Sequence, residues 1–223
     1  MGDLAAFDFD GTLTDGGSVI GFLSALVGRH TVQSAALALA PRLAAAALVG
    51  GSAADEAKER LFERVLAGVP VDHFEEVSTR YGRQHVERHL RPDVRDRFDW
   101  HRLRGDRVVI VSASPAAYVG AAGDWLGADG VIATRLEVGE HGRLTGHYDG
   151  RNCRGEEKLR RLRLWVDESG TAPGTTWAYG NSRGDLRLLR AADIGVNVGR
   201  LGRLGRLGSF TTLGTTPPDG AGG

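Results

Sequence analysis

Several sequence features that often indicate function are scarce or missing in this chain. Cys153 is the only cysteine among 223 residues, so no intramolecular disulfide can form and a structural zinc site is excluded. Neither sign of charge is in excess, because 28 Lys and Arg residues balance 28 Asp and Glu residues. This balance gives no electrostatic reason to bind nucleic acid. We therefore expect a cytoplasmic protein in a reducing compartment, with no nucleic-acid partner.

Long hydrophobic runs are also missing. The first residues, MGDLAAFDFDG, place acids where the core of a signal peptide would be apolar. The most apolar stretch, residues 31–50, is interrupted by Gln33, Pro41 and Arg42. It falls short of the length that a spanning helix needs, so we expect no integral membrane span. A surface-lying amphipathic helix remains an alternative for this stretch.

Lysine is scarce as well. Lys58 and Lys158 are the only lysines, so arginine supplies 26 of the 28 basic side chains. An ammonium group is a compact point charge on a flexible stem, which a planar guanidinium cannot imitate. The two positions that keep lysine are therefore candidates for a specific role.

The apolar patterns predict a sheet with helical crossovers. Runs rich in apolar and β-branched residues predict strands at 4–9, 107–113, 130–134, 175–180 and 194–198. Helical patterns occur at 92–104, 115–127, 155–167 and 183–192. Nearly continuous apolarity is typical of strands covered on both faces. The sequence thus predicts an α/β fold with a Rossmann-like parallel sheet as its core.

The interval between the first two strands is too long for an ordinary connection. Helical periodicity recurs there at 18–28, 31–49, 55–67 and 71–89. We expect an α-helical cap at residues 15–91, inserted into a core formed by residues 1–14 and 92–210. A β-hairpin is expected at 135–150. Residues 199–208 repeat GRLGRLGRLG, and the tail at 211–223 is expected to be disordered.

The clearest chemical signal is the segment DFDGT at residues 8–12, directly after the first strand. Asp8 and Asp10 project near the carboxyl edge of the sheet, where open α/β sheets bind ligands. Like charges this close require a cation, and Mg²⁺ suits oxygen donors.

Further polar residues follow other predicted strands or begin the next helix. They are Ser112 in VSASP, Lys158 in RGEEKLRRL, and Asn181 and Asp185 in GNSRGD. Singly they are weak signals, because a serine after a strand is commonly a helix cap and a helical lysine is commonly solvated.

The order and spacing of these motifs resemble the haloacid dehalogenase (HAD) superfamily of aspartate-nucleophile phosphatases, within it the phosphoserine-phosphatase-like subclass IB. The resemblance covers about residues 4–199: DFDGTLTD, VVIVSASP, the lysine of NCRGEEK, and YGNSRGD. It implies a phosphoric monoester hydrolase that acts through an aspartyl phosphate.

The resemblance also implies roles for individual residues. Asp8 would be the nucleophile, and Asp10 would protonate the leaving alcohol and then activate water. The implied metal ligands for Mg²⁺ are Asp8, Asp10, Asn181 and Asp185. The implied substrate-binding residues are Ser112, Lys158 and Thr12, with Lys58 of the insert as a further candidate.

Two departures from the family pattern limit the choice of substrate. Asn181 stands where an aspartate is usual, which removes a negative charge and predicts weaker metal binding. Gly11 stands where phosphoserine phosphatases usually have serine, and the segment after Asp15 lacks their glutamate. We therefore expect a small-molecule or lipid-like phosphate ester, and phosphoserine itself is disfavoured.

Several alternatives remain open or are disfavoured. A phosphotransferase or phosphomutase would share the chemistry, and a catalytically silent binding protein would keep only the fold. A carbon–halogen hydrolase does not need Asp10. The chain lacks the P-loop pattern, and HVERH at residues 85–89 lacks the HExxH order of zinc proteases. The oligomeric state is not indicated.

Overall fold

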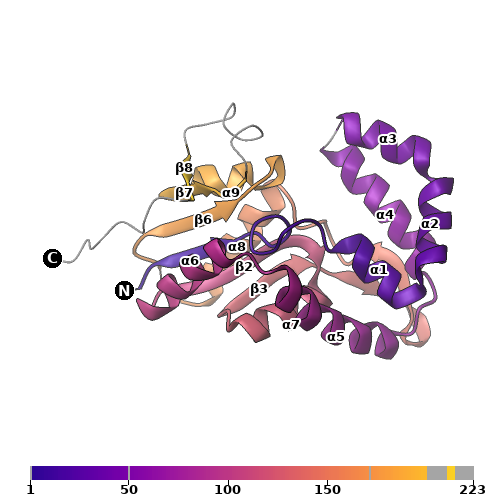
Figure 1. Cartoon of the computed structure of the whole chain (residues 1–223), viewed down its shortest axis with the longest axis horizontal. Coiled ribbons are helices and arrows are strands. Elements are labelled where there is room, and N and C mark those ends of the chain that lie inside the picture. Colours follow the sequence, from indigo (N-terminus) through magenta and orange to yellow (C-terminus); the bar gives the residue numbers. More distant parts are fainter. Residues whose placement is uncertain (1, 50, 171, 200–209, 214–223) are drawn as a thin grey trace.

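A computed structural model describes residues 2–49, 51–170, 172–199 and 210–213 of the chain. Its centre is a parallel sheet in the order β3-β2-β1-β6-β7-β8 (Figure 1). The strands are β1 (Leu4–Phe7), β2 (Arg107–Pro115), β3 (Gly130–Thr134), β6 (Thr176–Gly180), β7 (Ile194–Asn197) and β8 (Thr211–Thr212). The predicted α/β fold with a parallel sheet is confirmed.

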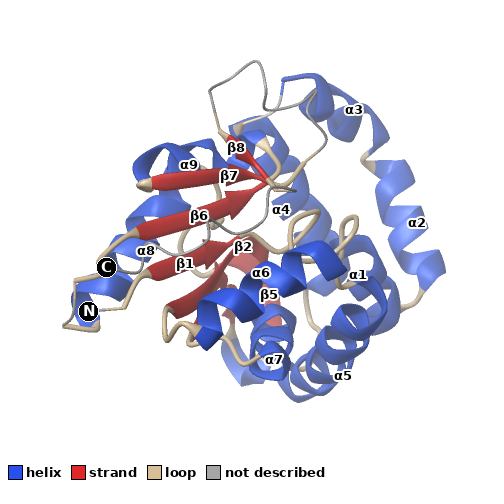
Figure 2. Ribbon diagram, turned by 60° about the vertical axis from the view of Figure 1, so that its left-hand side comes forward, coloured by secondary structure: helices blue, strands red, loops and turns tan. Residues whose placement is uncertain are grey.

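Helices cover both faces of this sheet (Figure 2). On one face, Ala5 and Phe7 of β1 pack with α6 (Pro92–Leu103) and α7 (Ala116–Leu126). On the other face, Leu4 and Ala6 pack with α8 (Glu156–Glu168) and α9 (Leu186–Ala191). Because alternate side chains of β1 point to opposite faces and all are apolar, this strand is buried at the centre of the sheet.

The long interval after β1 forms helices, as predicted. They are α1 (Val19–Val27), α2 (Arg29–Ala38), α3 (Ala40–Val49), α4 (Ser52–Leu66) and α5 (Val71–His89). Helices α1 to α4 stand beyond one end of the sheet, whereas α5 runs along α7 of the core (Figure 1). The two helices approach closely at Gly82, where a Cβ atom would lie 2.2 Å from the carbonyl oxygen of Tyr118.

The expectation of one helix over residues 31–49 is wrong. The chain forms α2 and α3 instead, which meet at Leu39 and Ala40. Pro41, the second residue of α3, has no N–H to continue an α-helical ladder, which is tolerated only in the first turn of a helix. The first helix therefore ends before the proline, at Ala38, and a new one begins at Ala40.

The hairpin is present, and part of the expected tail is ordered. Strands β4 (Leu136–Val138) and β5 (Leu144–Tyr148) pair antiparallel. The expectation of disorder is wrong for Thr211–Thr212, which form β8 beside β7, while the half-buried Phe210 packs against the apolar cluster under the sheet. Residues 214–223, and the repeat arginines at 200, 203 and 206, lie outside the described residues.

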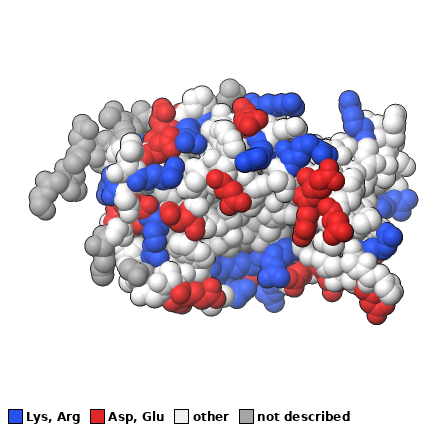
Figure 3. All heavy atoms as spheres, turned by 90° about the horizontal axis from the view of Figure 1, so that it is seen from below, with Lys and Arg blue, Asp and Glu red and all other residues white. Residues whose placement is uncertain are grey.

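The surface is mixed in charge on the face shown in Figure 3, where Lys and Arg side chains are interspersed with Asp and Glu. Among the helices that the structure describes, none combines the length and the apolar character needed to cross a membrane.

Candidate active site

The polar residues singled out from the sequence meet at the carboxyl edge of the sheet. β1 lies between β2 and β6, so residues that follow these three strands are brought together. Asp8 and Asp10 follow β1, Ser112 lies near the end of β2, and Asn181 follows β6. The first turn of α8 adds Lys158 to this edge.

Asp8 is buried and held by two side chains. Its Oδ2 atom accepts a hydrogen bond of 2.9 Å from the Thr12 hydroxyl. Its Oδ1 atom lies 2.6 Å from the Nζ atom of Lys158. Burial and the charge of Asp185 raise the pKa of Asp8, whereas the ammonium of Lys158 opposes that rise. Asp8 is therefore a fixed carboxylate whose charge depends on its cationic neighbour.

Lys158 bridges two carboxylates. Its Nζ atom also lies 2.7 Å from Oδ1 of Asp185, and the residue is only 1% exposed. Burial alone would favour the neutral amine, but the two carboxylates outweigh it and raise the pKa of Lys158. An ammonium group thus stays charged at the centre of the site.

Asp185 is engaged by protein groups at both oxygens. Oδ1 accepts from Lys158, and Oδ2 accepts from the N–H and hydroxyl of Ser182, at 3.0 and 2.7 Å, and from the N–H of Asn181 at 3.3 Å. Ser182 and Asp185 form a capping box at the turn before α9. Burial opposes ionisation of Asp185, yet Lys158 and Ser182 lower its pKa.

The two residues that depart from the family pattern, Gly11 and Asn181, lie next to each other. The Nδ2 atom of Asn181 donates to the main-chain carbonyl of Asp10 at 3.3 Å. Gly11 lies beside it with φ of +76°, and a Cβ atom there would lie 2.0 Å from Nδ2 of Asn181. A side chain at position 11 is therefore incompatible with the observed place of Asn181. The sequence offered no sign that these two positions are in contact.

Asp10 is oriented by two serines that sequence reasoning missed. The N–H of Ser18 donates to Oδ1 of Asp10 at 2.7 Å, and the hydroxyl of Ser114 donates to Oδ2. Ser114 also donates its N–H to the Ser112 hydroxyl oxygen at 3.0 Å. Ser114 lies two residues after Ser112 on the same strand, and this alternation was a usable signal.

Lys58 reaches the site region from α4. Its Nζ atom donates to the carbonyl of Ala113 at 2.6 Å and lies 3.4 Å from Oδ1 of Asn152. Burial lowers the pKa of Lys58 to about 8, although the charges of Asp10 and Asp55 oppose this. Its ammonium therefore lies beside the main chain that joins Ser112 to Ser114.

The donors available for a metal ion are oxygens of mixed type. In the part of the chain that the structure describes, no three His, Cys, Asp or Glu side chains are grouped to hold a metal. The Asp10 carbonyl and the Asn181 amide are nevertheless in contact, and Asp8 follows the same strand, two residues before Asp10. Carboxylate, carbonyl and amide oxygens are suitable ligands for Mg²⁺, so the residues fit that ion.

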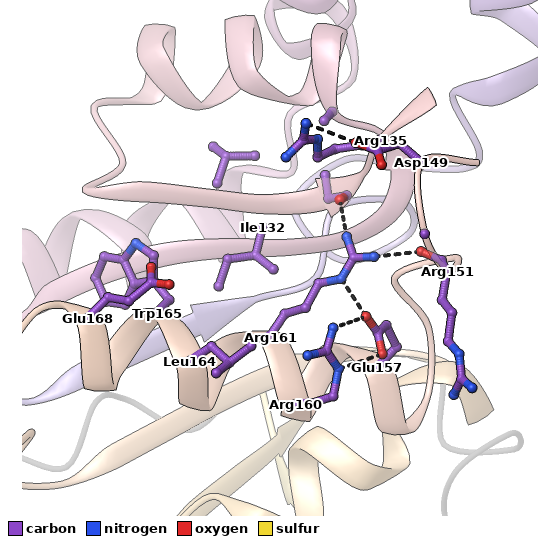
Figure 4. Close-up of a pocket in the computed structure, with 14 residues that line it drawn as sticks. Ile132, Arg135, Asp149, Arg151, Glu157, Arg160, Arg161, Leu164, Trp165 and Glu168 are labelled. Carbon is purple, nitrogen blue, oxygen red and sulfur yellow. Dashed lines mark hydrogen bonds and ion pairs between the residues drawn. The ribbon is translucent and has the colours of Figure 1, made fainter. Parts of the chain in front are cut away.

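A separate pocket of about 720 Å³ lies between β3 and α8 (Figure 4). Arg161 crosses it and bonds to Glu157 and to the carbonyl oxygens of Ala133 and Arg151. None of the residues proposed above for chemistry lines it. The candidate active site is therefore the carboxyl edge of the sheet rather than this groove.

Comparison with known proteins decides the family. Residues 5–190 match the haloacid dehalogenase-like hydrolase family. The chain belongs to this family. This hydrolase is 36% identical over 190 residues to protein CicA of Caulobacter vibrioides, covering 85% of the chain and 83% of CicA. It is 31% identical over 201 residues to a phosphoserine phosphatase of Halobacterium salinarum, covering 87% and 85% of the two chains.

Solved structures share the fold of this HAD hydrolase. A Bordetella pertussis protein of unknown function aligns with a TM-score of 0.78 at 22% identity, covering 96% of this chain and 99% of that one. A substrate-bound phosphoserine phosphatase aligns with a TM-score of 0.62 at 19% identity, covering 89% and 86%. The predicted family and fold are confirmed, and the family with its phosphatase relatives supports a phosphatase.

Proposed function

We propose that this HAD hydrolase is a Mg²⁺-dependent phosphomonoester hydrolase that acts through an aspartyl phosphate on Asp8. The observation that carries the proposal is the pairing of a buried Asp8 with Lys158 at 2.6 Å, next to an Asp10 carboxylate fixed by Ser18 and Ser114. Two-step phosphoryl transfer requires a nucleophile and a proton donor at one site, and Asp8 and Asp10 supply these two groups in the proposal.

In the first step, an Asp8 oxygen attacks phosphorus while the bond from phosphorus to the ester oxygen breaks. Asp10 gives its proton to the departing alkoxide, which leaves as the alcohol. In the second step, Asp10 takes a proton from the water that attacks phosphorus, and the bond to Asp8 breaks to release inorganic phosphate. Lys158 and the Ser112 and Thr12 hydroxyls bind phosphoryl oxygens in this scheme, and most of the catalysis comes from positioning and charge.

For the metal, we assign Asp8, the Asp10 carbonyl and the amide oxygen of Asn181 as ligands. Mg²⁺, when bound, neutralises negative charge on the phosphoryl group. Asp185 is better suited to orient Lys158, because its Oδ2 atom already accepts three hydrogen bonds from Ser182 and Asn181, whereas each oxygen of Asp8 accepts only one from the described residues. The amide of Asn181 must turn its oxygen toward the ion, since its Nδ2 atom faces the Asp10 carbonyl.

The substrate we propose is a small-molecule phosphate ester in the cytoplasm, admitted under a cap at residues 15–91. One named relative is a phosphoserine phosphatase, and another, 27% identical over 193 residues, is a histidinol-phosphatase of Neisseria meningitidis. Phe22, Leu23 and Leu26 of the insert are buried in the core cluster. Their apolar character serves packing, so it gives no argument for a lipid-like ester.

The test is phosphate release from p-nitrophenyl phosphate, with and without Mg²⁺. We expect metal-dependent turnover by the wild type and a loss of at least about 1000-fold in Asp8→Asn, because an amide is not a nucleophile. Asp96→Asn, at an exposed position of α6, is the matched control and should retain activity. Absence of metal-dependent turnover, or full activity in Asp8→Asn, would refute the proposal.

A further inference from the structure

The Asp10 carboxylate lies in a ring of polar groups. Its Oδ1 accepts the N–H of Ser18 at 2.7 Å, and its Oδ2 accepts the hydroxyl of Ser114. The hydroxyl of Tyr118 lies 2.7 Å from that of Ser18, and Ser114 opposes the rise that burial causes in the pKa of Tyr118. Tyr118 thus lies beside both serines, behind the carboxylate.

The members of this ring come from separate parts of the chain. Ser114 lies at the end of β2, Tyr118 in the first turn of α7, and Ser18 at the entrance to α1. Tyr81 of α5 adds an outer support by donating its hydroxyl to the Ser18 carbonyl at 2.8 Å. The ring therefore ties Asp10 both to the core and to the start of the helical insert.

Tyr118 is held rigidly. The residue is 0% exposed, and its ring packs against Phe9, Phe22 and Tyr81 at centroid distances of 6.5, 4.6 and 5.5 Å. A side chain enclosed in this way has little room to change its rotamer. Its hydroxyl is therefore held at hydrogen-bond distance from the Ser18 hydroxyl.

Tyr118 reaches Asp10 most directly through Ser18. The hydroxyls of Tyr118 and Ser18 share a hydrogen bond that either can donate, while the N–H of Ser18 donates to Oδ1 of Asp10. Removing the tyrosine hydroxyl leaves the Ser18 hydroxyl without this partner, next to the N–H that holds the carboxylate.

We propose that Tyr118 is a positioning residue that acts through Ser114 and Ser18 to hold Asp10 in the orientation for proton transfer to the leaving group. This inference rests on the proposed phosphatase function. The consequence is selective, because an ester whose alcohol leaves easily needs little help from a proton donor, whereas an alkyl ester depends on it. Loss of positioning should therefore affect alkyl phosphates more than aryl phosphates.

The test variant is Tyr118→Phe, which keeps the ring packing and removes only the hydroxyl. Turnover is compared on p-nitrophenyl phosphate and on alkyl phosphate monoesters accepted by the wild type. We expect kcat to fall about 10-fold or more on alkyl esters and less than about 3-fold on the nitrophenyl ester, a part of the ~100-fold or more that general acid catalysis supplies. KM should change little, since Tyr118 does not touch the substrate.

Two further variants keep the inference falsifiable if Tyr118→Phe does not fold. Ser114→Ala removes the hydroxyl that contacts Asp10 and should also lower kcat more on alkyl than on aryl esters. Ser114→Thr keeps a hydroxyl at this position and should restore kcat on the alkyl esters. Tyr179→Phe is the matched control, because that buried hydroxyl bonds to His101 instead. It should affect both substrate classes equally.

The outcomes separate the two proposals. If the wild type shows no Mg²⁺-dependent turnover on any ester, the proposed function itself fails. If the wild type is active but the Tyr118 and Ser114 variants lose the same factor on aryl and alkyl esters, or lose nothing, the positioning role is overturned and the phosphatase function stands.

Discussion

Lys158 offers the sharpest test of how the site is held together. Its Nζ atom lies 2.6 Å from Asp8 and 2.7 Å from Asp185, and the three side chains are 2%, 9% and 1% exposed. In Lys158→Met these two carboxylates remain buried without a cation. Removing one partner of a buried ion pair costs about 3–5 kcal/mol of the free energy of unfolding. A domain is stable by only ~5–15 kcal/mol, so the loss is large.

The assay is urea unfolding at pH 7 in the presence of a chelator, so that no metal replaces the lost charge. Arg163→Met, at an exposed position of the same helix, is the control and should change stability by less than about 0.5 kcal/mol. Lys158→Met/Asp185→Asn should recover part of the loss, because one buried negative charge is gone. A loss below about 1 kcal/mol in Lys158→Met would refute the idea that this ammonium neutralises the cluster.

Three further predictions concern the metal, the turn and pH. Asn181→Asp should bind Mg²⁺ more tightly, by about 10-fold in a calorimetric titration, since it adds a charged ligand; no tightening would contradict the assignment of Asn181. Gly11→Ala should lower thermal stability by about 1–2 kcal/mol and reduce turnover, because its φ is +76° and its Cβ would lie 2.0 Å from Asn181; unchanged melting would argue against this contact. Burial lowers the pKa of His101 to about 4, so the unfolded chain binds its proton first as pH falls from about 6.5. Stability should therefore fall by up to ~1.4 kcal/mol per pH unit between pH 6.5 and 4, and His101→Gln should flatten that slope in urea unfolding.

The sheet and the members of the candidate site could be predicted because their signals are local. Five of the strands are short apolar runs, and a strand covered on both faces needs little beyond such a run. Asp8, Asp10 and Asn181 follow strands that the parallel topology places side by side. Once a parallel sheet is inferred, residues after its strands must share one edge, so the site follows from the fold class.

The contacts between these residues could not be predicted, because they depend on exact distances between remote segments. Ser18 meets Tyr118 across 100 positions of sequence, and Lys58 meets Ala113 across 55. No periodicity encodes such pairs. The contact between Gly11 and Asn181 is similar, since each position looks like an independent departure until the turn brings them together.

Electrostatics connects the predictions made for this site. Asp8 and Asp185 share one fully engaged ammonium, that of Lys158, while Asp10 receives hydrogen bonds from the neutral groups of Ser18 and Ser114. A bound phosphoryl group adds further negative charge. Lys58 alone cannot offset this charge, because its ammonium is hydrogen-bonded to the Ala113 carbonyl. The described side chains therefore leave a negative excess when substrate binds, and a divalent cation is the simplest way to balance it. Asn181 makes this excess smaller than an aspartate would, so tighter metal binding in Asn181→Asp and loss of stability in Lys158→Met are two consequences of the same imbalance.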